Sequence, residues 1–243
     1  GADIIDVGGE STRPGAVTVS AAEELARVVA VVQALAQRVE VPISVDTSKL
    51  EVMEAALEVG AGMINDVSAL GGADGDENSP LDQRKVALLL KNDALVVLMH
   101  RQGTPQAMQI DPKYQDVVWD VYRFLDRRVQ ECQQAGIAKE RLLVDVGFGF
   151  GKTAGHNLEL MRRQRVFRGL GVALLYGVSR KRVVGLLSKE KRPHRRDVGS
   201  HVLAVFGMLT GATIFRVHDV EGARQALDTA WGWINEGKLQ DWL

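Results

Sequence analysis

The sequence predicts an α/β protein of the (β/α)8 TIM barrel class, with seven strands present and the first β-α unit missing. Short apolar runs alternate with longer stretches of helical periodicity, which is the order of successive β-α units around a parallel sheet. Several runs are apolar almost throughout, as strands covered on both faces are. The length of 243 residues suits one barrel, so we expect a single domain over 1–243.

The predicted strands are spread along the whole chain. They are the runs Ile4–Gly9, Ile43–Thr47, Met63–Ser68, Leu95–His100, Leu142–Gly147, Ala173–Ser179 and Thr213–Val220. A barrel of this class has eight strands, and the chain enters its first run almost at once, so we expect a segment upstream. We also expect an opening between the strand from Ile4 and the strand from Thr213, whose backbone edges have no partner.

The segments between the runs carry helix signals. Ser20 and Ser48 each begin an S-x-x-E capping box in front of apolar residues at helical spacing. The segment 116–134 has an apolar stripe that includes Cys132, and Gly136 follows it as a stop signal. We therefore predict that helices begin at both capping boxes and that Cys132 is a core residue.

Composition and charge favour a small-molecule ligand. The net charge of -1 gives no overall indication of a nucleic-acid or membrane partner, and no segment has the roughly 18 uninterrupted apolar residues of a membrane span. The single cysteine excludes an internal disulfide and a cysteine-based metal cluster. We therefore expect a cytoplasmic protein.

Polar side chains stand at nearly every predicted strand end, where parallel β-α folds place their ligand sites. A first group offers carboxylates, an amide and an ammonium to the edge of a planar heterocycle such as a pterin: Asp46, Asn65, Asp145 and Lys181. A second group supplies a hydroxyl, two guanidinium groups and an imidazole, which suit a diphosphate: Thr12, Arg13, Arg216 and His218. Aspartates near a phosphate also suit Mg²⁺, although its ligands are unknown from the sequence.

Two other patterns are less specific. The glycine-rich segment Gly147–Lys152 lacks the Walker spacing, so we interpret it as an aromatic-lined turn. His156, His194 and His201 have no metal-ligand spacing, which predicts surface or structural roles.

Several sequence blocks, in order, resemble dihydropteroate synthase over essentially the whole chain. They are Asp6-Val-Gly-Gly-Glu-Ser-Thr-Arg-Pro-Gly15, Ile43-Ser-Val-Asp-Thr-Ser-Lys49, Ile64-Asn-Asp66, Leu98-Met-His100, Gly147-Phe-Gly-Phe-Gly-Lys152, Ser179-Arg-Lys181 and Arg216-Val-His-Asp-Val220. The resemblance implies a transferase on a pterin-binding TIM barrel that condenses a dihydropterin diphosphate with p-aminobenzoate in folate biosynthesis. It also implies a homodimer built from the late helices, Mg²⁺, and competition by sulfonamides.

The resemblance assigns roles to residues that match the family blocks. The pterin would be held by Asp46, Asn65, Met99, Asp145 and Lys181; the diphosphate by Thr12, Arg13, Arg216 and His218; and p-aminobenzoate by Pro14, Phe150, Ser179 and Arg182. Lys181, Asp145, Arg216 and His218 would be the catalytic residues. Two alternatives remain open: a non-catalytic relative that acts as a subunit, and a pterin-binding methyltransferase that passes a methyl group from a folate.

The chain also departs from the family pattern. Nothing corresponds to the family's opening strand and its N-V-T-P-D-S-F-S-D-type loop. Val146 replaces a usual proline, Arg101 a common methionine, and Arg182 a small hydroxyl residue. Arg182 would either clamp the p-aminobenzoate carboxylate or fill its pocket, and we favour the carboxylate contact slightly.

Overall fold

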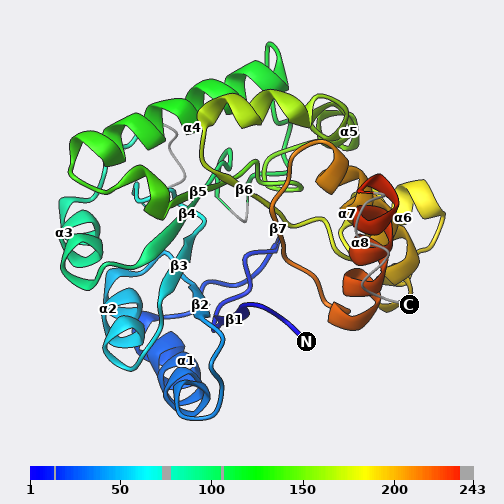
Figure 1. Ribbon diagram of the computed structural model, residues 1–243. Helices are drawn as coiled ribbons and strands as arrows, with labels where there is room; N and C mark the ends of the chain where they lie inside the picture. The colour runs from blue at the N-terminus through cyan, green and yellow to red at the C-terminus, as the bar shows by residue number, and fades with distance from the viewer. Residues whose placement is uncertain (14, 73–77, 105–106, 236–243) are drawn as a thin grey trace.

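The computed structural model describes residues 1–13, 15–72, 78–104 and 107–235, and its framework is one parallel sheet. The strands run β1 (Ile5–Gly8), β2 (Ile43–Asp46), β3 (Met63–Asp66), β4 (Leu95–Met99), β5 (Leu142–Asp145), β6 (Ala173–Tyr176) and β7 (Ile214–Phe215). They are hydrogen-bonded in sequence order, so the sheet curls as a barrel does (Figure 1). All seven predicted strands are confirmed.

Helices surround the curled sheet on its outer side (Figure 1). They are α1 (Ala21–Ala36), α2 (Leu50–Glu58), α3 (Gln83–Asn92), α4 (Val117–Gln134), α5 (Ala154–Arg162), α6 (Arg182–Ser188), α7 (Asp197–Leu209) and α8 (Val220–Ile234). In the part of the chain that the structure describes, three 3₁₀ helices lie between them: η1 (Lys139–Arg141), η2 (Gln164–Leu170) and η3 (Pro193–Arg195). None of the helices in the described ranges is long and apolar enough to cross a membrane.

Alternation along the strands separates two apolar layers. Side chains such as Ile64 and Val144 pack outward, in the main core between the sheet and the helices. Their neighbours Met63, Val97 and Leu143 form a smaller buried cluster with Leu175 on the other face of the strands, which is the barrel interior. The outer layer therefore holds the helices to the sheet, and the inner layer forms the floor beneath the strand ends.

The sheet has two edges in the described part of the chain. β1 pairs with β2 and β7 pairs with β6, but no pairing joins β1 to β7. The expected opening between the strand from Ile4 and the strand from Thr213 is therefore present. β7 has only two residues, which is consistent with hydrogen bonding on one side alone.

The helix starts confirm one predicted cap and correct the other. Ser20 accepts a hydrogen bond from the Glu23 N–H and caps α1. The capping box predicted at Ser48 is wrong, because α2 begins one residue later, after Lys49, without a side-chain cap. The Thr47 hydroxyl instead accepts the Lys49 N–H at 3.2 Å. Cys132 is fully buried in α4, as predicted.

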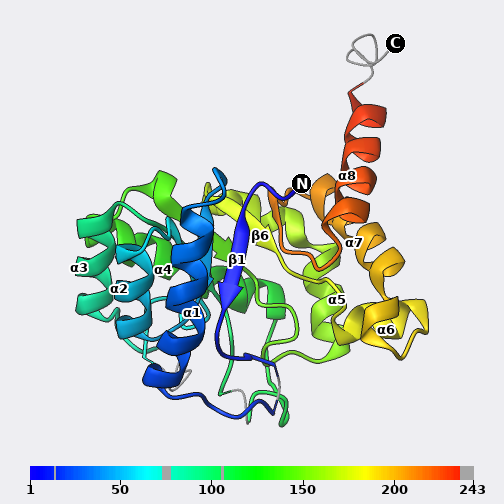
Figure 2. The ribbon, with the colours of Figure 1, turned by 90° about the horizontal axis from the view of Figure 1, so that it is seen from below.

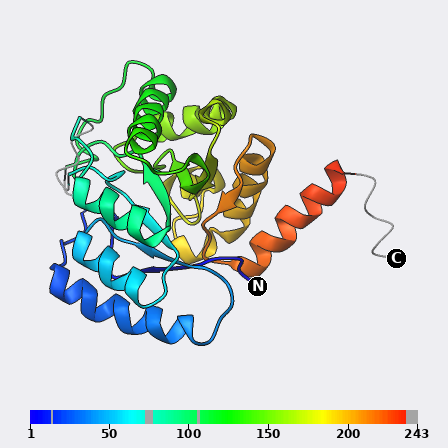
Figure 3. The ribbon, with the colours of Figure 1, turned by 60° about the vertical axis from the view of Figure 1, so that its left-hand side comes forward.

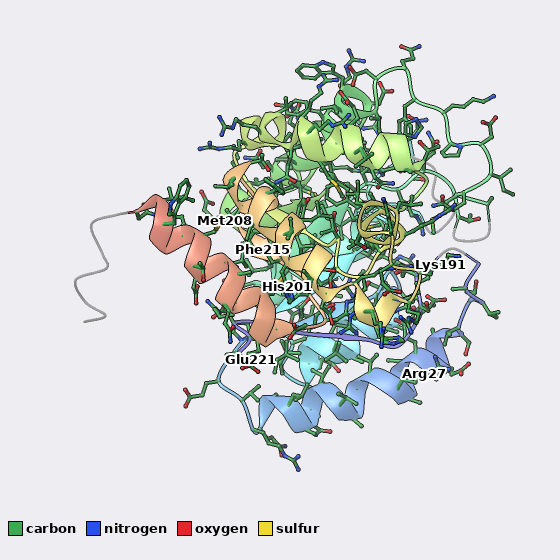
Figure 4. The ribbon with its side chains drawn as sticks, turned by 90° about the vertical axis from the view of Figure 1, so that its right-hand side faces the viewer. Arg27, Lys191, His201, Met208, Phe215 and Glu221 are labelled. Atoms are coloured by element: carbon green, nitrogen blue, oxygen red, sulfur yellow. The ribbon has the colours of Figure 1, made fainter. Side chains whose placement is uncertain are left out.

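The last helices stand apart from the others. α8 extends away from the barrel, as two views of the ribbon show (Figures 2 and 3). It packs mainly on α7, where His201 contacts Asp219, the N-cap of α8, at 3.2 Å. His201 lies close to the start of α8, near Glu221 (Figure 4). His201 thus has the structural role predicted for it.

Candidate active site

A large cavity lies inside the barrel, over the carboxyl ends of the strands and along the open side. Its volume is 1670 Å³. Its lining includes most of the predicted site residues: Thr12, Arg13, Met99, Asp145, Phe150, Ser179, Lys181, Arg182, Arg216 and His218. Residues from five of the strand ends and their loops therefore converge on one space, as the strand-end rule predicts.

Arg216 joins opposite sides of this cavity. It follows β7, and its guanidinium group contacts the carboxylate of Asp46 at 2.6 Å and that of Asp6 at 2.7 Å. Asp46 ends β2 and Asp6 lies within β1, so the contacts span the open side of the sheet. Burial raises the pKa of Asp46 to about 6, and Arg216 partly offsets this by stabilising the ionised form.

Two buried oxygen atoms beside this ion pair have no hydrogen-bond donor among the residues that the structure describes. Asp46 and Asn65 are paired in register at the ends of β2 and β3, and both side chains are buried. Asp46 Oδ1 and Asn65 Oδ1 lack a partner within the structure. A buried acceptor without a donor is costly, so these atoms indicate where a ligand with N–H groups would bind.

Lys181 is held against the glycine-rich turn between β5 and α5. Its ammonium group donates to the Phe148 carbonyl at 2.6 Å and lies 4.8 Å from the centroid of the Phe150 ring. Burial lowers the pKa of Lys181 to about 8, opposed by the nearby carboxylate of Asp145. Burial also raises the pKa of Asp145, whose carboxylate accepts the Gly147 N–H at 2.8 Å.

The glycine-rich turn needs its glycines for close approach. A Cβ atom on Gly147 would lie 1.8 Å from the His100 carbonyl oxygen, and its φ is +68°. Lys152, which ends the turn, contacts His100 Nδ1 at 2.8 Å and the Phe150 carbonyl at 3.0 Å. The segment is therefore an aromatic-lined turn fixed by a buried lysine rather than a phosphate cradle.

Ser179 and His218 form a second polar pair at the cavity wall. The Ser179 hydroxyl accepts the His218 backbone N–H at 3.2 Å and lies 2.9 Å from His218 Nδ1. The hydroxyl donates to Nδ1 when the ring proton is on Nε2, and accepts from Nδ1–H in the other tautomer. Burial, followed by the charges of Arg180 and Arg13, lowers the pKa of His218. The imidazole is thus neutral at neutral pH.

Contacts of Glu10 hold together the two ends of the loop that carries Thr12 and Arg13. Glu10 accepts the Val19 N–H at 2.7 Å, which closes the loop, and its other oxygen contacts the Lys49 ammonium at 2.6 Å. Lys49 also contacts the buried carboxylate of Glu24 on α1 at 2.5 Å. An ion pair of two carboxylates and one ammonium therefore holds this loop beside the start of α2.

The predicted site is largely assembled, with some exceptions. Asp46 and Asn65 lie beneath the cavity wall rather than among its lining residues, and Pro14 lies outside the described residues. Arg182 is exposed at the start of α6 and lines the cavity. Lys49, Lys152 and Arg180 have structural roles that were not predicted, although Arg180 lies inside one of the family blocks and Lys49 and Lys152 each end one.

Comparisons with known proteins agree on one family. A family profile described as "Pterin binding enzyme" matches residues 1–218. The dihydropteroate synthase of Escherichia coli K12 is 48% identical over 227 residues, which cover 93% of this chain and 77% of that protein. The chain belongs to the dihydropteroate synthase family. A second member, from Neisseria meningitidis serogroup C, is 47% identical over 95% of this chain and 78% of its own length.

Solved structures of family members give the same result. The Yersinia pestis dihydropteroate synthase, in a sulfonamide drug complex, has a TM-score of 0.89 and 43% identity, covering 97% of this chain and 82% of that one. The Xanthomonas albilineans enzyme with 4-aminobenzoic acid has a TM-score of 0.86 and 42% identity, with coverages of 97% and 80%. The same enzyme in complex with 7,8-dihydropteroate has a TM-score of 0.83 and 40% identity, with coverages of 97% and 82%.

These relatives decide between the enzyme classes that the sequence left open. The relatives named here are dihydropteroate synthases, which favours diphosphate chemistry over methyl transfer from a folate. The remaining alternative is a relative that binds ligands without catalysis, and it needs an experiment.

Proposed function

We propose that the chain condenses 6-hydroxymethyl-7,8-dihydropterin diphosphate with p-aminobenzoate. The bond between the pterin methylene carbon and the diphosphate oxygen breaks, and the diphosphate leaves with the electron pair. The amine nitrogen of p-aminobenzoate then forms a bond to the methylene carbon and loses a proton, which gives 7,8-dihydropteroate and diphosphate. Relatives of this chain are dihydropteroate synthases, including a structure with 7,8-dihydropteroate.

The groups gathered around one cavity are the observation that carries this proposal. Asp46 Oδ1 and Asn65 Oδ1 are buried acceptors without a donor among the described residues, and Arg216 contacts the other carboxylate oxygen of Asp46 at 2.6 Å. Arg13, Arg216 and His218 line the cavity beside them. A pterin presents N–H donors, and its diphosphate presents anionic oxygens, so the acceptors and the cationic groups match the two parts of one substrate.

Departure of the diphosphate is the step that these residues would assist. Arg216 and Arg13 are fixed positive charges, and His218 offers a neutral N–H when its ring proton is on Nε2, so they stabilise negative charge that grows on the leaving oxygen. Asp145 lines the same cavity and Asp46 lies beneath its wall, and where they are ionised these carboxylates would stabilise a methylene cation. Because both groups are positioned before reaction, little reorganisation is needed.

The p-aminobenzoate pocket would lie between the glycine-rich turn and the start of α6. Phe150 offers an aromatic face, and Ser179 and Arg182 offer donors to a carboxylate. Arg182 is exposed at the edge of the cavity, so its side chain can turn toward a carboxylate without displacing a buried group. This geometry supports the contact over the obstruction, and Pro14 keeps its proposed place in the pocket from the family match alone.

Mg²⁺ has a weaker structural basis than the two substrates. Among the described residues, no three His, Cys, Asp or Glu side chains gather in a way that could hold a metal ion. Asp6 and Asp46 lie together, but both are engaged by Arg216. These residues do not fit a resident metal site. A Mg²⁺ ion bound to the diphosphate would take its remaining ligands mostly from water.

The late helices support a homodimer. Large apolar side chains are exposed on α7 and α8: Val198, Val202, Phe206, Trp231 and Trp233. Large apolar side chains exposed on two helices that pack together are typical of protein interfaces. Light scattering after size exclusion tests this, and a monomer would contradict it. A free, buried Cys132 is consistent with the proposed cytoplasmic location.

The decisive experiment measures diphosphate release from the dihydropterin diphosphate, with and without p-aminobenzoate. We expect release that depends on p-aminobenzoate and equals the dihydropteroate formed. Calorimetric binding of the pterin without any turnover would instead support the non-catalytic relative. The Lys181→Ala variant, assayed in parallel, separates release at this site from background hydrolysis.

A further inference from the structure

The turn that presents Ser179 and Lys181 has a strained residue at its centre. Arg180 has a φ of +59°, in the left-handed region. This region is unfavourable for a residue with a Cβ atom, and arginine has no short side chain that could stabilise it locally. Such a conformation persists only where the surroundings hold it.

Helix α7 holds each part of Arg180. Its backbone N–H donates to the Ser200 hydroxyl at 3.0 Å. Its guanidinium group makes two parallel contacts with the Asp197 carboxylate, at 2.7 and 2.8 Å. Its carbonyl accepts from Arg196 at 3.0 Å. Every polar group of Arg180 therefore has a partner in the segment that begins α7.

Arg196 extends this arrangement to the neighbouring loop. The same nitrogen lies 3.4 Å from the Lys181 carbonyl, and the other guanidinium nitrogens donate to the carbonyls of Glu190 at 3.0 Å and Lys191 at 2.5 Å. Lys191 lies in the loop between α6 and α7 (Figure 4). The Ser200 hydroxyl in turn donates to the Arg196 carbonyl at 2.7 Å. We call Arg196, Asp197 and Ser200 the α7 clasp.

The two neighbours of Arg180 both contact groups of the proposed site. Ser179 makes the hydrogen bonds to His218, and Lys181 donates to the Phe148 carbonyl. Arg180 directs its own guanidinium group to Asp197, and because it lines the cavity its charge also lowers the pKa of His218. A change of φ at the central residue would rotate the flanking peptide groups, so Ser179 and Lys181 could not both keep their places.

We propose that Arg180 is a positioning residue, and that the α7 clasp holds it in the left-handed conformation so that Ser179 and Lys181 both face the substrates. This inference rests on the proposed function for its kinetic consequences. Its structural part, the position of Lys181, can be tested whether or not the chain catalyses the reaction.

Two substitutions separate the backbone conformation from the charge. Arg180→Ala removes the contacts with Asp197 and leaves a residue that disfavours a positive φ. Arg180→Gly removes the same contacts but adopts that φ without steric cost. We expect Arg180→Ala to lower kcat/KM by roughly tenfold, because small displacements of catalytic groups are costly, and Arg180→Gly to lower it much less. Equal losses in the two variants would overturn the proposal.

A double-mutant cycle tests whether Arg180 and Asp197 act as one unit. Asp197→Asn should lower kcat/KM about as much as Arg180→Ala, and the double variant should lose no more than either one, because the contact can be broken only once. If the losses of kcat/KM in the two single variants multiplied in the double variant, Arg180 and Asp197 would act independently, which would contradict the proposal.

The position of Lys181 can also be tested by a measurement that does not require catalytic activity. Its amine is held among Asp145, Asp46 and Arg216, with Phe148 and Phe150 against it. The reaction of this amine with a small acylating reagent, measured by peptide mass spectrometry across pH, reports its pKa. We expect release of the turn to raise this pKa from about 8 toward 10.5, because the ammonium regains water. An unchanged profile in Arg180→Ala would refute the proposal, even in a chain without synthase activity.

The matched control is another ion pair between structural elements. Arg163 contacts Asp116 at 2.9 Å, with side-chain exposures of 36% and 39%, against 28% and 25% for Arg180 and Asp197. Arg163→Ala should therefore cost similar stability but leave kcat/KM and the Lys181 profile unchanged. If Arg163→Ala changed kcat/KM and the Lys181 profile as much as Arg180→Ala, the α7 clasp would only stabilise the fold, and its positioning role would be overturned.

Discussion

The ammonium group of Lys181 lies over the ring of Phe150, 4.8 Å from its centroid, while it donates to the Phe148 carbonyl at 2.6 Å. The glycine-rich turn therefore contributes an aromatic face and a carbonyl dipole to a lysine that is only partly exposed to water. Neither contact is an ion pair, so Asp145 supplies the compensating charge. A ligand that binds here meets a cation and a carboxylate that are already positioned.

Removal of either charge should weaken pterin binding. Asp145→Ala and Lys181→Ala each remove a charge that stabilises the ionised form of the other group and a polar group of the proposed pterin site, so we expect dissociation constants about 5- to 150-fold higher, which corresponds to about 1 to 3 kcal/mol. Titration calorimetry with the hydroxymethyl dihydropterin measures this. Near-normal affinity in both variants would remove the two residues from the site.

Pterin affinity should depend on pH on both sides of neutrality. The pKa of Asp46 is raised to about 6, so its acceptor form is lost as the pH falls through that value. The pKa of Lys181 is lowered to about 8, so its cation is lost as the pH rises through that value. We expect tightest binding between about pH 6 and 8.

Two single variants test which residue causes the loss of pterin affinity at the acid limb and at the alkaline limb of this pH profile. Lys181→Arg keeps a cation at all accessible pH values and should abolish the alkaline limb. Asp46→Asn should flatten the acid limb at a lower overall affinity, with a remaining contribution from Asp145, whose pKa burial also raises. A wild-type profile that is flat from pH 5 to about 9 would contradict both assignments.

Arg216→Ala should discriminate between ligands with and without phosphate. Loss of the guanidinium group should weaken the diphosphate ester much more than the bare hydroxymethyl pterin, because the group is suited to phosphate oxygens. It also leaves Asp6 and Asp46 without their shared cation, so a smaller loss is expected for the bare pterin too. Calorimetry with both ligands measures the ratio, and equal losses would indicate a structural role alone.

Arg182→Ser should raise the Michaelis constant for p-aminobenzoate. The arginine is exposed at the edge of the cavity and is proposed to contact the substrate carboxylate. We expect an increase of roughly fivefold or more, the size typical of one charge-assisted hydrogen bond. An unchanged or lower constant would instead favour obstruction by the arginine, and p-aminobenzamide, which has no carboxylate, is the matched ligand control.

Gly147→Ala should destabilise the protein by more than about 2 kcal/mol, because it combines a positive φ with a steric clash. The added Cβ would meet the His100 carbonyl oxygen. Chemical denaturation measures the loss in the free energy of unfolding. Gly62→Ala is the control, since a Cβ there has no atom within 4 Å, and its effect should stay within about 0.5 kcal/mol.

Periodicity and strand-end chemistry were enough to predict the seven strands and to select residues of which most line one cavity. Strands such as Ile43–Asp46 and Leu142–Asp145 begin where the apolar runs begin. Strand ends were less predictable, because apolar residues continue into the loops. The run from Thr213 to Val220 contains a strand of only two residues, Ile214–Phe215, since the edge of the sheet offers one partner.

The features that the sequence did not predict depend on contacts between distant segments. Nothing in the letters Ser-Arg-Lys indicates a left-handed arginine, because that conformation depends on Asp197 and Ser200 in another helix. Ser48 has the right spacing for a cap, but Thr47 takes the Lys49 N–H and the helix begins later. A local sequence pattern cannot show which of two neighbouring hydroxyl groups accepts a backbone N–H, or which distant side chains hold a backbone conformation.

The contact between Arg216 and Asp46 joins positions 170 residues apart in the chain. Closing a loop of this length is unfavourable until the intervening β-α units have formed, so we expect this contact to form late in folding. The candidate site would then be completed only when the first and last strands have come together. A ligand that binds there binds only the folded chain and stabilises it by mass action. Substrate in the cell would thus act on the yield of folded enzyme as well as on turnover.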